Sequence, residues 1–558
     1  MARTIRSLLI VPLIAAAVPA AAFEFTFPWI NREASFEITE TLVLDYHDDN
    51  LDYGELGPNP YNDNYGDIRN RLNLKLSVED FSFAARIDTT TFIDAPDDPG
   101  IQYLDRYAPE KLNASYHGEN FQADLGDFYA SFGRAIALRI RKTDELSEDT
   151  TLLGGKLRAQ LGPVDLTALG GLSNPTNWDG VTEKTIDDPY DLITGLSVAV
   201  RPQESLVLRA HGVGLVIDPL EENQRAQGFI ETAMLPEYAF VAGGAVEVLG
   251  LADLADLYAE FNWMEKELKF PDMPAEDGWA AYFGGNLYLG DLTLTAEFKS
   301  YSDYELFSET DSESGKYKPE RLDYIRPPTL EPEDMEVTNN HDVTGARLKV
   351  DWRPWGGDTL LFASYAGFIA EDQSVANQPE KNRWIYNLQV GAEQFFLRRG
   401  RAKVDVGLRE EVPDWSGGNH HHLIYLDADV KVPLGVRHSL SVQGFNWWAH
   451  KLDALGAFDY LRGEWTLAYS WSPLLTLGVI LGYDTEYSQS RDLDIIKDIG
   501  GNPVRQVFMA GTVSVNLSSR VVLNLLAGQI RGGPKCVSGA CRVFPPFAGV
   551  RLETVIRL

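Results

Sequence analysis

Apolar and polar residues alternate along most of this chain, from about Asp67 to Leu558. These alternating stretches are about ten residues long. Tight turns and longer polar loops connect them alternately. In the clearest hairpin, residues 68–92, the turn is Glu79-Asp80. One face of its first strand is apolar and the other polar: Ile68, Leu72, Leu74, Leu76 and Val78 against Arg69, Arg71, Asn73, Lys75 and Ser77. A period of two without intervening helical stretches predicts an antiparallel sheet with one apolar and one polar face.

The lengths of the connections predict the topology. Eleven short turns alternate with twelve longer loops, which is typical of a single up-and-down β-barrel with short periplasmic turns and long extracellular loops. We therefore predict an all-β transmembrane barrel of about 24 strands, within a range of 22–26. Two stretches leave that range open. Residues 127–151 are long enough for a lumenal excursion, and residues 217–237 contain Gly228–Met234, which reads as an extra strand or an inward loop.

The N-terminus reads as a secretory signal. Arg3 and Arg6 precede an apolar core, Leu8–Ala17, and the small residues Ala20–Ala22 form a cleavage site. No later stretch approaches the roughly 18 consecutive apolar residues of a membrane-spanning helix. The predicted organisation is a signal peptide at 1–22, a short periplasmic segment at 23–35, and the barrel at 36–558.

The last twelve residues, Phe547–Leu558, form one more alternating strand. A chain that stops on such a strand resembles the outer-membrane β-barrels of Gram-negative bacteria, although those usually end on Phe or Trp and this one ends on Leu558. The resemblance implies export to the outer membrane, contact with outer-membrane lipid, and recognition of the last strand by the barrel assembly machinery.

Composition and charge fit this class. Hydrophobic residues make up 44% of the chain, yet the mean hydropathy is only −0.20, because apolar and polar positions are interleaved. The net charge of −33 argues against nucleic acid as a partner. Acidic residues gather in the long loops and predict a solvated rim, or alternatively divalent-cation binding. Aromatic residues near strand ends predict interfacial girdles: Trp279, Tyr282, Trp352, Trp355, Trp384, Tyr386, Trp447, Trp448, Trp465 and Trp471.

The only cysteines are Cys536 and Cys541, within a Gly/Pro-rich loop before the last strand. An isolated pair closing a small loop in an exported protein predicts a disulfide; a redox-active pair is the alternative. Two thiolates without further Cys or a nearby His make a poor zinc site.

A barrel of 24 strands has a backbone diameter of roughly 45–50 Å, too wide for wall side chains to fill. Its lumen must be narrowed by its own loops, filled by a partner, or left open. We expect a constriction at residues 126–142, G-D-F-Y-A-S-F-G-R-A-I-A-L-R-I-R-K, where Gly133 beside the off-pattern Arg134 predicts a bulge or kink.

This stretch resembles a largely uncharacterised group of bacterial outer-membrane proteins that carry G-D-F-Y-x-x-F-G-R-G-x-x-L, with Ala135 here where Gly is usual. The Cys-x4-Cys-Arg loop followed by Pro-Pro-Phe is similar to that group as well. The resemblance covers about 40 residues by comparison of motifs. It implies a barrel of the porin type and no established substrate.

The inward-facing positions are rich in basic residues, many of them in the first third of the chain. The candidate lumen and constriction residues are Arg69, Arg71, Lys75, Arg86, Arg134, Arg139, Arg141, Lys156 and Arg158. Charged walls select ions and orient polar solutes. Alternatively, these charges simply neutralise facing acids and stay hydrated. We expect a channel for small polar or charged solutes; the alternative is a sheath that encloses a periplasmic or secreted partner, such as a cytochrome or a secretion component.

Enzymatic chemistry is not indicated. Neither G-x-S-x-G nor H-E-x-x-H occurs, and no catalytic set, cofactor or resident metal is predicted. The one histidine cluster is His420-His421-His422. His420 and His422 share a face in an extended strand and have the chemistry to bind a transition metal, but the sequence shows no acidic neighbour to complete a site.

Overall fold

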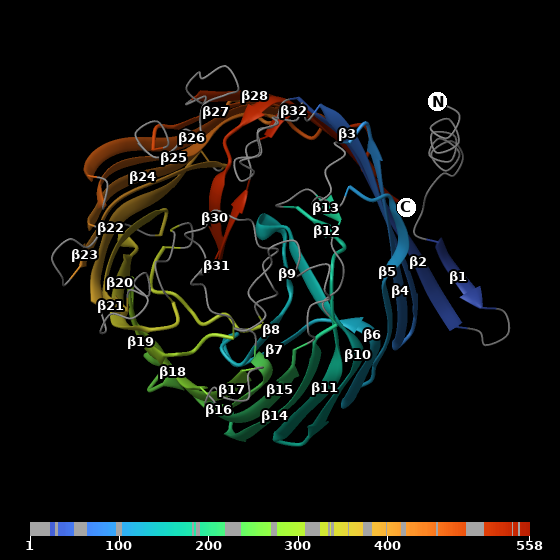
Figure 1. The fold of residues 1–558 in the computed structure, drawn as a ribbon, viewed down its shortest axis with the longest axis vertical. Helices are drawn as coiled ribbons and strands as arrows, with labels where there is room; N and C mark the ends of the chain where they lie inside the picture. The colour runs from blue at the N-terminus through green and yellow to red at the C-terminus, as the bar shows by residue number, and fades with distance from the viewer. Residues whose placement is uncertain are drawn as a thin grey trace.

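The architecture is a closed antiparallel β-barrel (Figure 1). The computed structural model describes residues 23–27, 32–48, 64–95, 103–180, 184–185, 190–217, 236–268, 276–306, 324–332, 335, 340–354, 357–371, 382–397, 399–413, 420–453, 456–486, 507–537, 540–544 and 547–558. The signal-peptide prediction and Gly228–Met234 lie outside these residues. Among them, no helix is long and apolar enough to cross a membrane.

Twenty-four strands form the wall, as predicted. They are β2 (Arg32–His47), β3 (Tyr65–Val78), β4 (Phe81–Ile93), β5 (Arg106–His117), β6 (Phe121–Phe128), β10 (Glu148–Leu161), β11 (Val164–Pro175), β14 (Leu192–Gln203), β15 (Leu206–Val216), β16 (Pro236–Leu251), β17 (Ala255–Leu268), β18 (Glu276–Leu289), β19 (Leu292–Ser302), β20 (Val343–Trp352), β21 (Thr359–Glu371), β22 (Asn382–Phe396), β23 (Gly400–Pro413), β24 (His420–Pro433), β25 (His438–Asp453), β26 (Gly456–Trp471), β27 (Leu475–Asp484), β28 (Val507–Asn516), β29 (Val521–Ile530) and β32 (Phe547–Arg557).

Each wall strand pairs with the next wall strand along the chain, and the barrel closes where β32 pairs antiparallel with β2. At this seam Asp45 lies opposite Arg551, and the Ile38 and Leu558 backbones exchange hydrogen bonds of 2.9 and 2.7 Å. The short turns and long loops lie close to the predicted positions. The largest difference is at the loop predicted for residues 450–460, where β25 ends at Asp453 and β26 begins at Gly456. The additional strand β1 (Phe23–Phe27) pairs with Arg32–Phe36 at the start of β2 and lies outside the ring (Figure 1).

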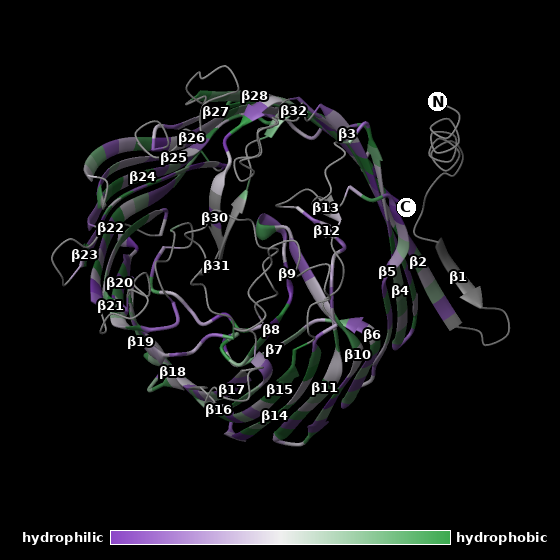
Figure 2. Ribbon diagram, in the orientation of Figure 1, coloured by the Kyte–Doolittle hydropathy of each residue, from purple (hydrophilic) through white to green (hydrophobic). Residues whose placement is uncertain are grey.

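Alternation of residues along the strands makes two different surfaces, visible as alternating bands in Figure 2. The outer surface carries large exposed apolar side chains around the barrel, for example Leu112, Leu157, Leu196, Phe240, Phe283, Leu348, Leu388, Ile424, Leu467 and Val479. Exposed apolar side chains at this density would be unfavourable in water. A closed barrel with this apolar outer belt is built to span a membrane.

The girdle prediction is confirmed in part. Six of the aromatic residues are exposed on the outer surface: Trp279, Trp352, Trp384, Tyr386, Trp448 and Trp471. The girdle prediction is wrong for Tyr282 and Trp447, because both side chains face the lumen. Tyr282 lies against Arg134 of an inner segment, and Trp447 lies beside the buried Arg462. Trp465 is half-buried, and Trp355 falls outside the described residues.

Several segments lie inside the ring (Figure 1). They are the stretch between β6 and β10, with β7 (Ala130–Phe132), β8 (Leu138–Ile140), β9 (Lys142–Thr143) and the 3-10 turn η2 (Asp144–Leu146); the hairpin of β12 (Trp178–Asp179) and β13 (Lys184–Thr185); the described residues of 303–342, which are 303–306, 324–332, 335 and 340–342; and the hairpin of β30 (Gly533–Val537) and β31 (Ala540–Phe544). We call residues 129–147 the inner hairpin segment.

Candidate lumenal site

The inner hairpin segment begins with a tight hairpin, in which β7 pairs with β8. Its turn includes Gly133 and Ala135 with φ of 62° and 66°, in the left-handed region that favours glycine. The predicted irregularity at Gly133-Arg134 is therefore a hairpin turn rather than a bulge. Ala135 occupies a position where an L side chain is disfavoured by about 1–2 kcal/mol.

A buried carboxylate holds this turn against the barrel wall. Glu260 of β17 accepts a hydrogen bond of 2.9 Å from the backbone N–H of Arg134 and another from Tyr258. A Cβ on Gly133 would come within 1.8 Å of a Glu260 carboxylate oxygen. Glycine at position 133 is thus favoured by the backbone conformation and also allows the turn to approach Glu260 closely.

The apolar residues of the inner hairpin segment form a hydrophobic core inside the barrel. Ile136, Leu138 and Ile140 are at most 1% exposed. They belong to one cluster with inward-facing residues of the wall, among them Leu152, Ile193, Val213, Val241, Met264, Val343, Phe368 and Ile385. One part of the inner wall is therefore apolar and is covered by the chain itself.

Residues of 303–342 complete this covering. The Arg139 N–H donates to the Tyr324 carbonyl at 2.7 Å, and the Arg326 N–H donates to the Ala135 carbonyl at 2.7 Å. The Tyr304 hydroxyl donates to the Ile136 carbonyl at 3.1 Å. Burial raises the Tyr304 pKa well above its usual value, so this hydroxyl keeps its proton. The two inner segments thus share backbone hydrogen bonds as well as the apolar core.

Glu331 anchors the same region to β22 and β23 of the wall. Its carboxylate accepts from Arg409 Nε at 2.9 Å and from the Asn387 amide at 3.2 Å, and all three groups are buried. A buried carboxylate that pairs with a guanidinium fixes position and register.

The predicted constriction residues have different environments. Arg139 is 2% exposed; its guanidinium pairs with Glu148 at 2.9 Å and donates to the Thr143 hydroxyl at 2.7 Å. Arg141 is exposed, and partial burial together with the nearby charge of Arg139 lowers its pKa. Arg139 is therefore a packing group, whereas Arg141 is accessible to a solute.

Arg134 is also exposed, at the tip of the inner hairpin segment. Its guanidinium lies over the ring of Tyr258 at 4.2 Å and that of Tyr282 at 5.5 Å. A small pocket of about 70 Å³ adjoins it, lined also by Glu247 and Glu297. Among the described residues, no carboxylate pairs with this guanidinium. It presents an accessible positive charge supported by aromatic rings.

The basic residues of the first strands are mostly neutralised. Arg69 pairs with Asp45 and Asp67, and its guanidinium lies 4.4 Å from the ring centroid of Trp178 in β12. Arg86 pairs with Asp149 at 2.6 Å.

The other predicted positions of this wall vary. Lys156 pairs with Asp124 at 2.9 Å, and Arg71 lies 3.5 Å from Asp88. Lys75 and Arg158 are exposed and form no ion pair with another described residue. The neutralised arrangement, the alternative to a basic wall, thus describes most of these groups.

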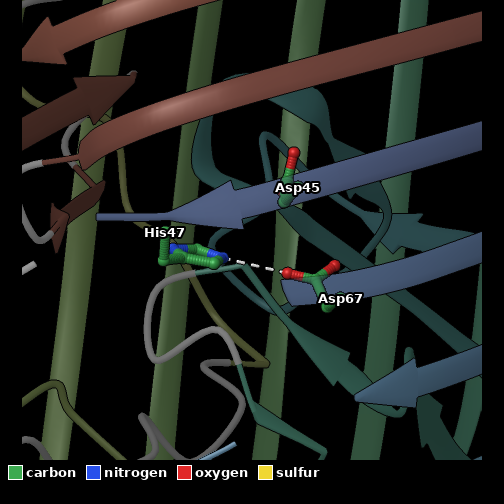
Figure 3. A group of neighbouring side chains, drawn as sticks. All are labelled: Asp45, His47 and Asp67. Carbon is green, nitrogen blue, oxygen red and sulfur yellow. Dashed lines mark hydrogen bonds and ion pairs between the residues drawn. The ribbon is translucent and has the colours of Figure 1, made fainter. Parts of the chain in front are cut away.

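One group of side chains has the composition of a metal site, namely Asp45, His47 and Asp67 (Figure 3). Their ligand atoms lie within 4.8 Å of one another, and His47 Nε2 lies 3.0 Å from Asp67. However, Arg551 Nε donates to both Asp45 oxygens at 2.8 and 2.9 Å, and Arg69 contacts both carboxylates. Two guanidiniums already balance the two acids, so a cation does not fit this group.

Cys536 and Cys541 lie opposite each other as Cα partners in the hairpin of β30 and β31. Direct opposition on antiparallel strands brings Cα atoms into the range that a disulfide spans. The disulfide stays a prediction, because the two side chains lie outside the described part of the structure. β30 itself lies against η2 of the inner hairpin segment.

The histidine cluster does have an acidic neighbour, which the sequence did not reveal. Glu410 of β23 lies 3.1 Å from His420 Nε2 and also contacts His422. Strand register supplies this residue from ten positions away in the sequence. A signal was available in the sequence, because residues at similar distances on either side of a hairpin loop face each other. This rule places Glu410 opposite His422.

These features define the class of protein as a membrane-spanning β-barrel with internal segments. No known family model matches the chain, and no curated protein sequence is similar to it. Among solved structures, it is similar to the Pseudomonas aeruginosa siderophore receptor PirA (TM-score 0.46, 10% identity, 94% of this chain and 80% of that one). It is also similar to OccK3 (OpdO) of P. aeruginosa (0.38, 11%, 68% and 92%) and to a BenF-like porin of P. fluorescens Pf-5 (0.37, 8%, 73% and 99%). At these TM-scores, the likenesses carry no argument about function.

Proposed function

We propose that this protein is an outer-membrane channel for small polar or charged solutes, with a lumen narrowed by its own inner segments. The observation that carries the proposal is that inward-facing charges away from the covered apolar wall remain accessible to water. Arg401 pairs with Asp429 across β23 and β24, yet their side chains are 40% and 37% exposed. Charged side chains that are this exposed in the lumen are in contact with water. A hydrated inner wall is a route that polar solutes can follow.

The narrowing is supported by the position of the inner hairpin segment. It is fixed to the wall through Glu260 and to residues of 303–342 through backbone hydrogen bonds. The hairpin of β30 and β31 reaches it from another part of the wall. A solute that passes these segments would meet Arg134 and Arg141, two accessible cations of the inner hairpin segment.

The sheath hypothesis has less support. A sheath would keep a wide lumen free for its partner, whereas the apolar wall between β10 and β22 is already covered by the chain's own residues. We therefore propose the channel, located in the outer membrane of a Gram-negative bacterium.

The test is single-channel conductance of the refolded protein in a planar bilayer, with reversal potentials measured in a salt gradient. We expect a stable conductance. Arg141→Glu and Arg134→Glu should each shift the preference toward cations, because each places a negative charge where an accessible positive one stood. Arg520→Glu, in an exposed turn between β28 and β29, is the matched control and should leave the reversal potential unchanged.

Silence from a correctly folded barrel would refute the channel. Capture of a specific partner from native membranes by that silent barrel would then support the sheath. Equal reversal potentials in all variants would show that solutes do not pass the inner hairpin segment.

A further inference from the structure

Four titratable side chains lie in one row across β23–β26. Glu410 is the register partner of His422, His422 of His450, and His450 of Asp459. His420 lies two residues from His422 on the same strand and therefore on the same face. Together with His420, the row places three imidazoles and two carboxylates on one face of four neighbouring strands.

This row lies on the outer surface, at the loop ends of the strands. Toward the membrane, the next outward row is Ile424, Trp448 and Leu461, each between 41% and 43% exposed. His421, with the opposite alternation, instead points inward to Tyr460, whose hydroxyl is 2.9 Å from its Nε2. The titratable row thus sits where the apolar belt gives way to water.

The contacts within the row are all between histidine and carboxylate. Glu410 Oε2 lies 3.1 Å from His420 Nε2, while Oε1 contacts His422 Nδ1. His450 Nδ1 lies 2.7 Å from Asp459. Within the described residues, no lysine or arginine pairs with any of these side chains. This differs from the Asp45 group, where guanidiniums occupy the carboxylates.

We propose that this row binds a divalent transition metal ion of the zinc, nickel or copper type. His420, His422, His450 and Glu410 are the ligands, because imidazole nitrogens with one carboxylate suit zinc, nickel and copper better than magnesium or calcium. In the structure these ligand atoms meet only in pairs, so metal binding requires rotation of the side chains toward a common ion. Asp459 is a positioning residue: it fixes the ring of His450 through Nδ1 and leaves Nε2 for the metal. The site is independent of the proposed channel, since it lies on the other side of the wall.

The test is titration of the refolded, untagged protein in detergent micelles with zinc by calorimetry, together with the visible absorption of the cobalt form. We expect one ion per chain and a cobalt spectrum of low coordination number. His422→Ala should weaken zinc binding at least 100-fold, since His422 is central in the row. Asp459→Asn should weaken it 10- to 100-fold, as for other carboxylates that orient a ligand histidine.

His438→Ala is the matched control, because His438 is an exposed histidine at the turn end of β25 that contacts Tyr469. It should bind zinc as the parent protein does. Glu410→Gln provides a second variant that keeps the side-chain shape, and heat-dependent gel mobility checks that each barrel is folded.

The proposal is overturned if the parent protein binds no zinc at micromolar concentration, or if a His420/His422/His450 triple alanine variant keeps the parent affinity. Loss of binding in His47→Ala alone would place the metal at the Asp45 group instead and would also overturn it. Binding that appears only when anionic lipid is added would show that lipid phosphates, not this row, supply the essential ligands.

Discussion

Neutralising one seam carboxylate should weaken the whole barrel. The Asp45 side chain of β2 is fully buried and pairs with Arg551 of β32 and Arg69 of β3. A single group therefore links the last wall strand to the first two wall strands. Asp45→Asn keeps the volume and shape but removes the charge, and the amide nitrogen is a donor that faces two donors. The substitution tests whether the ion pairs hold the seam or the backbone ladder alone suffices.

The structure sets the magnitude. A hydrogen bond to a charged group contributes about 1.5–3 kcal/mol. Arg551 loses its contact with the Asp45 carboxylate. Because the Arg551 side chain is about one-third exposed, we take the lower limit of this range for its loss. Arg69 keeps its 2.7 Å bond to Asp67, which limits the second loss. We therefore expect the free energy of unfolding to fall by about 3 kcal/mol.

The assay is urea unfolding of the barrel in lipid vesicles, followed by tryptophan fluorescence. Asp144→Asn is the control, since Asp144 is 76% exposed in its pair with Lys142 and should change stability by less than about 1 kcal/mol. If the Asp45→Asn variant unfolds at the same urea concentration as the parent protein, the reasoning is refuted. The backbone hydrogen bonds would then account for the stability of the seam.

Two further substitutions test the inner segments. Ala135→Gly should stabilise the inner hairpin by about 1 kcal/mol, because glycine adopts the left-handed backbone at φ 66° without the strain of an L side chain. Slower amide hydrogen exchange in β7 and β8 would confirm this prediction, and unchanged exchange would contradict it. Glu331→Ala should release residues 324–332 from Arg409 and Asn387 and so give a larger or noisier single-channel current, and Glu331→Gln should have an intermediate effect. A current identical to that of the parent protein would show that the Glu331 contacts do not limit the width of the lumen.

Much of the barrel could be predicted because its signals are local. Turns such as Glu79-Asp80 and Leu161-Gly-Pro163 interrupt alternating strands, and a regular succession of short and long connections fixes both the strand number and the neighbour of each strand. The two aromatic errors had a local signal as well. Trp447 and Trp448 are adjacent in one strand and must face opposite sides, and Trp279 and Tyr282 differ by an odd number of positions.

The site could be predicted only in part, because its contacts join distant parts of the chain. The apolar run Ile136–Ile140 marks a buried segment, yet nothing local shows that Glu260 holds its turn or that Tyr324 pairs with Arg139. The charge of Arg139 suggested a lumenal cation, whereas its pairing with Glu148 depends on how the segment folds back. Such pairings follow from the path of loops through the lumen, which alternation along strands does not encode.

The seam also bears on the order of assembly. Asp45 and Arg551 are separated by 506 positions, and the seam to which they belong joins the two ends of the barrel sequence. Bringing such ends together from a flexible chain costs roughly 5–6 kcal/mol of entropy, whereas each neighbouring hairpin closes over a few residues. The sheet should therefore grow hairpin by hairpin and close last. Until then both edge strands, β2 and β32, expose unpaired backbone groups that could pair with another chain, so the open barrel is the stage most exposed to mispairing.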